Sequence, residues 1–83
     1  MINIPAQKAK EIRRYVENYE VKQLIKVLTE LKVFAKERSI LKIHKNEFEF
    51  LRKNRLKYSS ERLDKRNTES NIAIKTILEN IPR

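Results

Sequence analysis

The stretch AQKAKEIRRYVENYEVKQLIKVLTELKVFAKE, residues 6–37, decides the fold of this chain of 83 residues. Its first part repeats apolar residues at spacings of four, three and four, which places them on one face of a helix. These residues are Ala9, Ile12, Val16 and Tyr19. The same register would next place Gln23 and Lys26 on the apolar face, so the pattern changes phase near residues 18–20.

A second apolar register begins after this phase change. It consists of Val21, Leu24, Leu28, Leu31 and Ala35, and Ile25, Val27 and Phe34 widen it. Asn18 is a candidate helix N-cap, and the dipole of the following helix favours the acidic Glu20 in its first turn. We therefore predict an antiparallel helical hairpin formed by residues 6–17 and 19–37. A single bent helix of 32 residues is the alternative interpretation.

Residues 39–51 fit two patterns. With a period of two, Leu41, Ile43, Phe48 and Phe50 flank a turn at Lys45-Asn46, as in a β-hairpin. With a period of 3.6, Asn46 caps a helix that directs Phe48, Leu51 and Tyr58 toward the core. The acidic first turn, with Glu47 and Glu49, favours the helix. The absence of glycine also disfavours the hairpin, because turns without glycine are poor hairpin turns.

A last helix is predicted from a cap at Ser59 or Ser60 to the stop at Pro82. Its inward positions, spaced by three and four, are Leu63, Asn67, Ser70, Ile74, Ile77 and Ile81. Because Asn67 and Ser70 are polar, the segment is either one long helix or two, with a break near Asn67 and a new cap at Thr68. The fold prediction is one all-α domain over residues 1–83, a small bundle of three to four helices. The alternative is an α+β winged-helix-like fold with a β-hairpin at about 40–51.

The residue types that are missing exclude several functions. The chain has no Gly, and phosphate-binding P-loops and dinucleotide-binding turns both require it. Left-handed backbone positions are therefore expected at Asn, in Asn18, Asn46, Asn54 and Asn67. With no Cys and one His, a zinc site is nearly excluded, and we expect no metal and no cofactor. No apolar run exceeds three residues, so we expect a cytoplasmic protein without a membrane partner.

Positive charge is concentrated in one segment. The formal net charge is +9, and residues 52–66 alone hold seven basic and two acidic residues. Phosphates neutralised by Lys or Arg release counterions, and Arg adds bidentate geometry, so this segment predicts contact with the backbone of DNA or RNA. Tyr58 could stack on an unpaired base. The predicted nucleic-acid-binding residues are Arg52, Lys53, Arg55, Lys57, Tyr58, Arg62, Lys65 and Arg66.

A secondary basic face lies on the first predicted helix. It consists of Lys8, Lys10, Arg13 and Arg14, which Glu11 and Glu17 partly offset. This face either extends the binding surface or is an ordinary solvated helix face. The same choice applies to the charge run at 52–66, where the overall excess of charge favours binding.

The chain offers too few groups for catalysis. His44 is its one imidazole and Asp64 its one aspartate, so the sequence provides few partners for a nucleophilic triad or a paired carboxylate site. His44 is expected at the surface or at its boundary, and Tyr15 and Tyr19 in boundary packing. The sequence therefore predicts that the protein is not an enzyme.

Two functions follow from these patterns. The first is nucleic-acid binding, by a helix-turn-helix-like module or by a small subunit of a nucleoprotein complex such as a ribosome or a replication or transcription assembly. The second is a helical protein-interaction module that docks on an acidic partner or forms a homodimer through its apolar stripes. The salt dependence of binding separates these two hypotheses.

Overall fold

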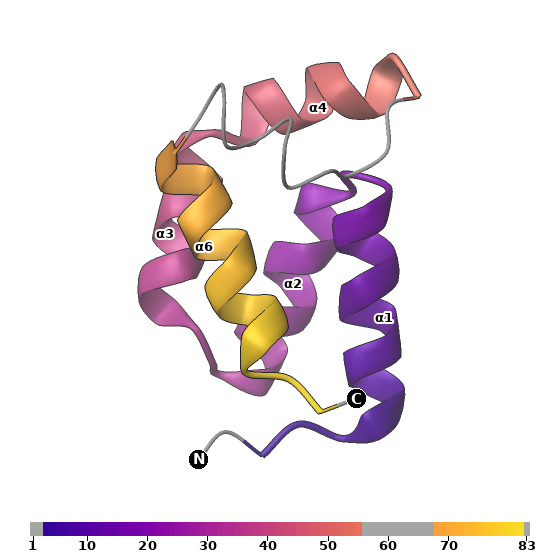
Figure 1. Ribbon diagram of the computed structural model, residues 1–83, viewed down its shortest axis with the longest axis vertical. Coiled ribbons are helices and arrows are strands. Elements are labelled where there is room, and N and C mark those ends of the chain that lie inside the picture. The colour runs from indigo at the N-terminus through magenta and orange to yellow at the C-terminus, as the bar shows by residue number, and fades with distance from the viewer. Residues whose placement is uncertain (1–2, 56–67, 83) are drawn as a thin grey trace.

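The computed structural model describes residues 3–55 and 68–82 (Figure 1). These residues form five helices, which are α1 (Ala6–Glu17), α2 (Val21–Leu31), α3 (Ala35–Ile43), α4 (Lys45–Lys53) and α6 (Thr68–Glu79). No strand occurs within them. The all-α prediction is confirmed for this part of the chain, with five helices rather than three to four. The winged-helix alternative is wrong there, because α3 and α4 occupy the stretch assigned to the β-hairpin.

The helices alternate in direction around one core (Figure 1). α1 and α2 pack against each other, α3 returns beside α2, and α6 packs along α3. α4 lies across one end of this arrangement and contacts both α2 and α3. The start of α1 and the end of α6 lie at the opposite end, where the guanidinium of Arg13 donates a hydrogen bond to the carbonyl oxygen of Pro82.

The predicted apolar face of α1 is confirmed. Ala9, Ile12, Val16 and Tyr19 are all buried. On α2 and α6 the buried residues again follow helical spacing, and they are Val21, Leu24, Val27, Leu28, Ser70, Asn71, Ala73, Ile74 and Ile77. Each large apolar side chain buried in this way contributes about 1.5–3 kcal/mol to stability. Leu63 and Asn67, and with them the choice between one last helix and two, lie outside the described residues.

The predicted helix over 19–37 is wrong in its second half. The chain leaves α2 at Lys32 and starts α3 after Phe34, and both residues have left-handed backbone angles, with φ of 57° and 53°. The turn lets Phe34 and Leu41 enter the same core as Leu24. The single helix of 32 residues is wrong as well, because the chain also turns between α1 and α2, where Tyr19 has a φ of 56°.

Helix ends that usually require glycine are made here without it. At the end of α1, the N–H of Tyr19 donates to the oxygen of Val16 and the N–H of Glu20 to that of Tyr15, which is the Schellman pattern. The same pattern ends α2, where the N–H of Lys32 bonds Thr29 and that of Val33 bonds Leu28. The residue that turns the chain has a φ of 56° in Tyr19 and 57° in Lys32.

The prediction that Asn takes the left-handed positions is therefore wrong for Asn18, Asn46 and Asn54, while Asn67 lies outside the described residues. The positive-φ residues among those described are Tyr19, Lys32, Phe34 and Arg55. Asn18 and Asn54 stand one residue earlier, as helix C-caps. Their side-chain amides donate to the oxygens of Arg14 and Phe50, at 3.1 and 2.7 Å. Asn thus adds its side-chain donor to a helix-end carbonyl that already accepts the backbone N–H of the same Asn, and the next residue makes the turn.

Asn46 does not cap α4, because it lies within the helix, which begins after His44. The rest of that prediction is confirmed where it can be followed. Phe48 and Leu51 are buried, and the ring of Phe48 lies 6.0 Å from that of Tyr19. Tyr58 is outside the described residues. α4 therefore turns one apolar face onto α2 and α3 and leaves its other sides in solvent.

Candidate nucleic-acid interface

The C-terminal end of α4 carries the described part of the predicted binding segment. Arg52, Lys53 and Arg55 are all exposed there. The other predicted residues, Lys57, Tyr58, Arg62, Lys65 and Arg66, lie outside the described residues. Three cations within four positions, at the exposed end of a short helix, form the nucleus of the candidate site.

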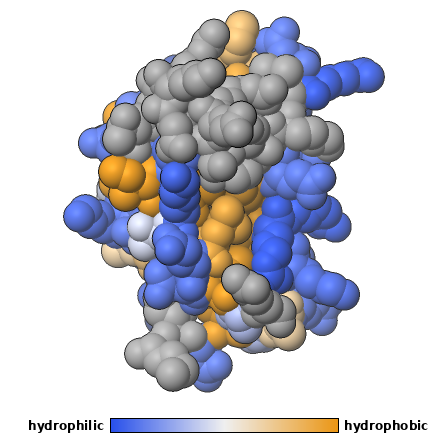
Figure 2. Space-filling view, viewed as in Figure 1, coloured by the Kyte–Doolittle hydropathy of each residue, from blue (hydrophilic) through white to orange (hydrophobic). Residues whose placement is uncertain are grey.

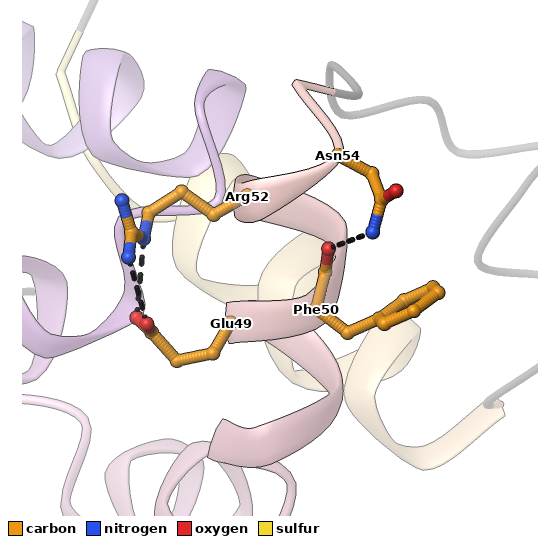
Figure 3. Close-up of polar contacts among 4 residues, drawn as sticks. All are labelled: Glu49, Phe50, Arg52 and Asn54. Atoms are coloured by element: carbon orange, nitrogen blue, oxygen red, sulfur yellow. Dashed lines mark hydrogen bonds and ion pairs between the residues drawn. The ribbon is translucent and has the colours of Figure 1, made fainter.

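Arg52 is held by an acidic neighbour on its own helix. Its Nε and Nη2 atoms donate to the two carboxylate oxygens of Glu49, at 3.2 and 2.9 Å (Figure 3). This hydrogen bond lowers the pKa of Glu49, desolvation opposes the shift, and the charges of Arg52, Lys22 and Lys53 lower it further. The same bond raises the pKa of Arg52. Part of the donor capacity of Arg52 is therefore already used within the protein.

Lys53 and Arg55 are more available than Arg52. Within residues 3–55 and 68–82, no salt bridge or hydrogen bond engages either side chain. Arg55 follows the C-cap Asn54 with a φ of 56°, so it leaves the axis of α4 at the turn. A lysine or arginine without an internal partner can bind a phosphate without first breaking a contact in the protein.

The fold adds a cation that the sequence did not point to. Lys22, in the first turn of α2, is exposed and close enough to Glu49 to influence its pKa. It stands 27 residues from Glu49 in the chain and is brought near because α2 packs against α4. No pattern in the sequence indicates this pairing. We call Lys22, Arg52, Lys53 and Arg55 the basic end.

The secondary basic face of α1 is largely engaged in internal contacts. Lys8 forms an ion pair with Glu11 at 3.3 Å, and the guanidinium of Arg14 lies 5.3 Å from the ring centre of Tyr15. Arg13 donates to Pro82, as described above, and Lys10 is exposed. Lys10 and Arg13 also line a surface hollow of about 550 Å³, together with Ala6 and Gln7. These contacts favour the interpretation of this face as an ordinary solvated helix face.

His44 joins two parts of the fold. Its Nε2 atom lies 2.9 Å from a carboxylate oxygen of Glu69, so the junction of α3 and α4 is tied to the first turn of α6. The half-buried side chain is at the boundary of the surface, as predicted. Across the described residues, no group of three or more His, Cys, Asp or Glu side chains is placed to hold a metal ion.

Three large apolar side chains of the described residues remain in solvent. Ile43 on α3 is 73% exposed, Phe50 on α4 is 59% exposed, and Ile72 on α6 is 57% exposed. Figure 2 also shows apolar surface between α6 and α1, with hydrophilic side chains on both sides of it. The surface of this strongly charged chain therefore includes apolar positions that the core does not use.

Comparison with known protein families, with curated proteins and with solved structures finds no match to this chain. Among the described helices, none has the length and apolar character needed to cross a bilayer.

Proposed function

We propose that this protein binds nucleic acid, with the basic end against the phosphate backbone. The observation that carries the proposal is the pair Lys53 and Arg55, two exposed cations without salt-bridge partners among the described residues. They stand at the start of the segment 52–66, which holds seven basic and two acidic residues. Such a density of positive charge favours a polyanion, since every neutralised phosphate releases counterions.

Lys22 enlarges this surface. A backbone of phosphates extends over many ångströms, so a ligand that contacts Lys53 can also reach the first turn of α2. Helix-turn-helix-like binding to a duplex and a role as a small subunit of a nucleoprotein complex are finer hypotheses within the proposal. A panel of duplex DNA, single-stranded DNA and structured RNA separates them.

The test is a fluorescence-anisotropy titration at several salt concentrations. If the wild-type protein makes five to seven phosphate contacts, log Kd should change with log salt by a slope of about 4 to 6 in magnitude. The double variant Lys53→Gln with Arg55→Gln removes two charges at the basic end. We expect weaker binding and a slope smaller by about 2.

The matched control removes the same net charge elsewhere. Lys32 and Lys36 are exposed and lie at the connection of α2 and α3, at the end of the molecule opposite to α4 (Figure 1). Lys32→Gln with Lys36→Gln should leave the slope nearly unchanged. Equal losses in both double variants would show that total charge acts rather than the basic end. Absence of binding by the wild-type protein near 50 mM salt would reject the proposal.

A protein-interaction module is the second candidate. Ile43 directly precedes His44, and Ile72 stands one helical turn after Glu69, so these two exposed residues flank the contact between His44 and Glu69. Exposed apolar side chains of this kind favour docking of a second copy or of an acidic partner. Ultracentrifugation over a range of protein concentrations tests the homodimer. A constant monomer mass, unchanged in Ile72→Glu, would reject it.

A further inference from the structure

Phe50 is the aromatic side chain that the described fold leaves most exposed. The other aromatic residues described are buried or half-buried, and they are Tyr15, Tyr19, Phe34 and Phe48. Leaving a Phe ring in water forgoes the favourable free energy of its burial. The core does not require Phe50, because Phe48 and Leu51 already fill the inner face of α4. The ring of Phe50 is therefore available for a contact outside the core.

Polar groups that suit a nucleotide surround this ring. Figure 3 shows Phe50 on the side of α4 away from the Glu49–Arg52 pair, next to Asn54. Lys53 and Asn54 follow Phe50 by three and four residues, so the three side chains are neighbours on the helix surface. One N–H of the Asn54 amide is used by the oxygen of Phe50, at 2.7 Å. The Oδ1 atom of Asn54 and the ammonium of Lys53 are left to a ligand.

We propose that Phe50 is a stacking platform for an unpaired nucleobase, with Lys53 on the adjacent phosphate, so that the preferred ligand is single-stranded. This inference rests on the proposed function and narrows its ligand. Every base has a face that stacks on an aromatic ring, and single-strand binding proteins combine such rings with cations that follow the backbone. In a duplex the base faces are covered by their neighbours, so Phe50 would find no partner there.

The charge around the ring favours this occupant over a protein. Phe50 neighbours Lys53 on the surface of α4, and an apolar protein surface that covered the ring would have to desolvate this cation. Ile72 is about as exposed as Phe50 and Ile43 is more exposed, but they lie on other helices, α6 and α3. They are neither aromatic nor adjacent in sequence to the basic end, so they serve as matched controls.

The first experiment uses the absence of tryptophan from the chain. Phe50→Trp places the single indole at the platform, and Ile72→Trp places one on α6. Each variant is titrated with oligo(dT), oligo(U) and a DNA duplex of the same length. We expect quenching of the Phe50→Trp fluorescence by one or both single strands, and little change with the duplex or in Ile72→Trp. The stronger of the two single strands separates DNA from RNA.

The second experiment measures affinity by anisotropy for Phe50→Ala, Phe50→Tyr and Ile72→Ala. Phe50→Ala should weaken single-strand binding about tenfold, within the range for loss of one stacked base. Phe50→Tyr should bind as the wild type does, since the ring is retained, and Ile72→Ala should be unchanged. Because Phe50 is exposed, the thermal midpoint of Phe50→Ala should stay close to that of the wild type.

The possible failures are distinguishable. If the wild-type protein binds neither single strands nor duplex, the proposed function fails, and the stacking inference fails with it. If the wild-type protein binds but Phe50→Ala binds single strands equally well, the proposed function stands and the stacking inference is rejected. Equal weakening toward single strands and duplex, or no quenching in Phe50→Trp, also rejects stacking.

Discussion

Lys32→Gly is expected to stabilise the protein, although it removes a lysine from the end of a helix. Lys32 occupies the turning position after α2 with φ of 57° and ψ of 41°, where glycine is the usual residue. A residue with a Cβ atom in this left-handed conformation costs about 1–2 kcal/mol. The side chain is exposed and has no hydrogen bond or salt bridge within the described residues, so the substitution breaks no contact of its own.

The net gain is smaller than the strain that is relieved. Glycine also gives the unfolded chain more conformational freedom, which lowers the free energy of unfolding by about 0.4–1 kcal/mol. The expected gain is therefore about 0.5–1 kcal/mol. In a domain of this size, 1 kcal/mol corresponds to about 4–8 °C in the thermal midpoint. We expect Lys32→Gly to melt about 2–8 °C above the wild type when the helical circular-dichroism signal is followed on heating.

Two controls make this test specific. Lys26 is also an exposed lysine of α2, but it lies inside the helix, so Lys26→Gly should cost about 1 kcal/mol. Lys32→Ala removes the charge but keeps the Cβ atom and should produce no gain. If Lys32→Gly lowers the midpoint as much as Lys26→Gly does, the conformation assigned to Lys32, and the strain inferred from it, are wrong.

Three further predictions concern an ion pair, the core and a helix end. The pKa of Glu49 is lowered in the folded state, so its pair with Arg52 stabilises the protein above the ordinary carboxyl pKa of about 4.3. This contribution is lost as the pH falls through the lowered pKa. The thermal midpoint of Glu49→Gln should therefore fall less between about pH 6 and pH 2 than that of the wild type. Ile77→Ala, at a fully buried position, should cost about 2–5 kcal/mol in urea unfolding, and a loss below about 1 kcal/mol would contradict its place in the core. Asn80→Ala should cost about 0.5–1 kcal/mol because its amide donates to the oxygen of Thr76 at 2.8 Å, whereas Asn46→Ala, which breaks no hydrogen bond within the described residues, should cost nothing.

Glu49 also connects stability to the proposed function. Removing its carboxylate frees the donors of Arg52 and takes one negative charge from the basic end. If the basic end contacts phosphates, Glu49→Gln should bind nucleic acid more tightly and with a steeper salt dependence, while becoming slightly less stable at neutral pH. A variant that loses both affinity and stability would contradict this arrangement of charges.

The local helical patterns were sufficient to predict which faces of α1 and α4 are buried. The spacing from Ala9 to Tyr19 identified the buried side of α1, and Phe48 and Leu51 identified that of α4. Periodicity succeeds in these places because a side chain's direction on a helix depends only on its position along the helix. The break at Lys32–Phe34 could not be found in this way, since Leu24, Leu28, Leu31 and Ala35 continue one helical register through it. The break lets Phe34 and Leu41 pack in the same core as Leu24, and such packing is a property of the whole fold.

Some features of the candidate site could likewise be predicted from the sequence, whereas others required the structure. The concentration of charge at 52–66 and the exposure expected of Arg52, Lys53 and Arg55 come from the sequence, because runs of cations avoid burial. The ion pair between Arg52 and Glu49 could be predicted from their spacing of three residues, but only once α4 was known to be a helix. The exposure of Phe50 depended on the same decision, since in a β-hairpin Phe48 and Phe50 would share one face.

By itself, the sequence determined that this protein is basic and free of glycine, and it favoured a helical fold, since these properties follow from composition and local periodicity. Only the tertiary structure decided where the second helix ends, which residues accept left-handed backbone angles, and that Lys22 lies near the end of α4 while the cations of α1 are engaged internally. Those outcomes depend on contacts between residues far apart in the chain, whose free energies local propensity does not contain.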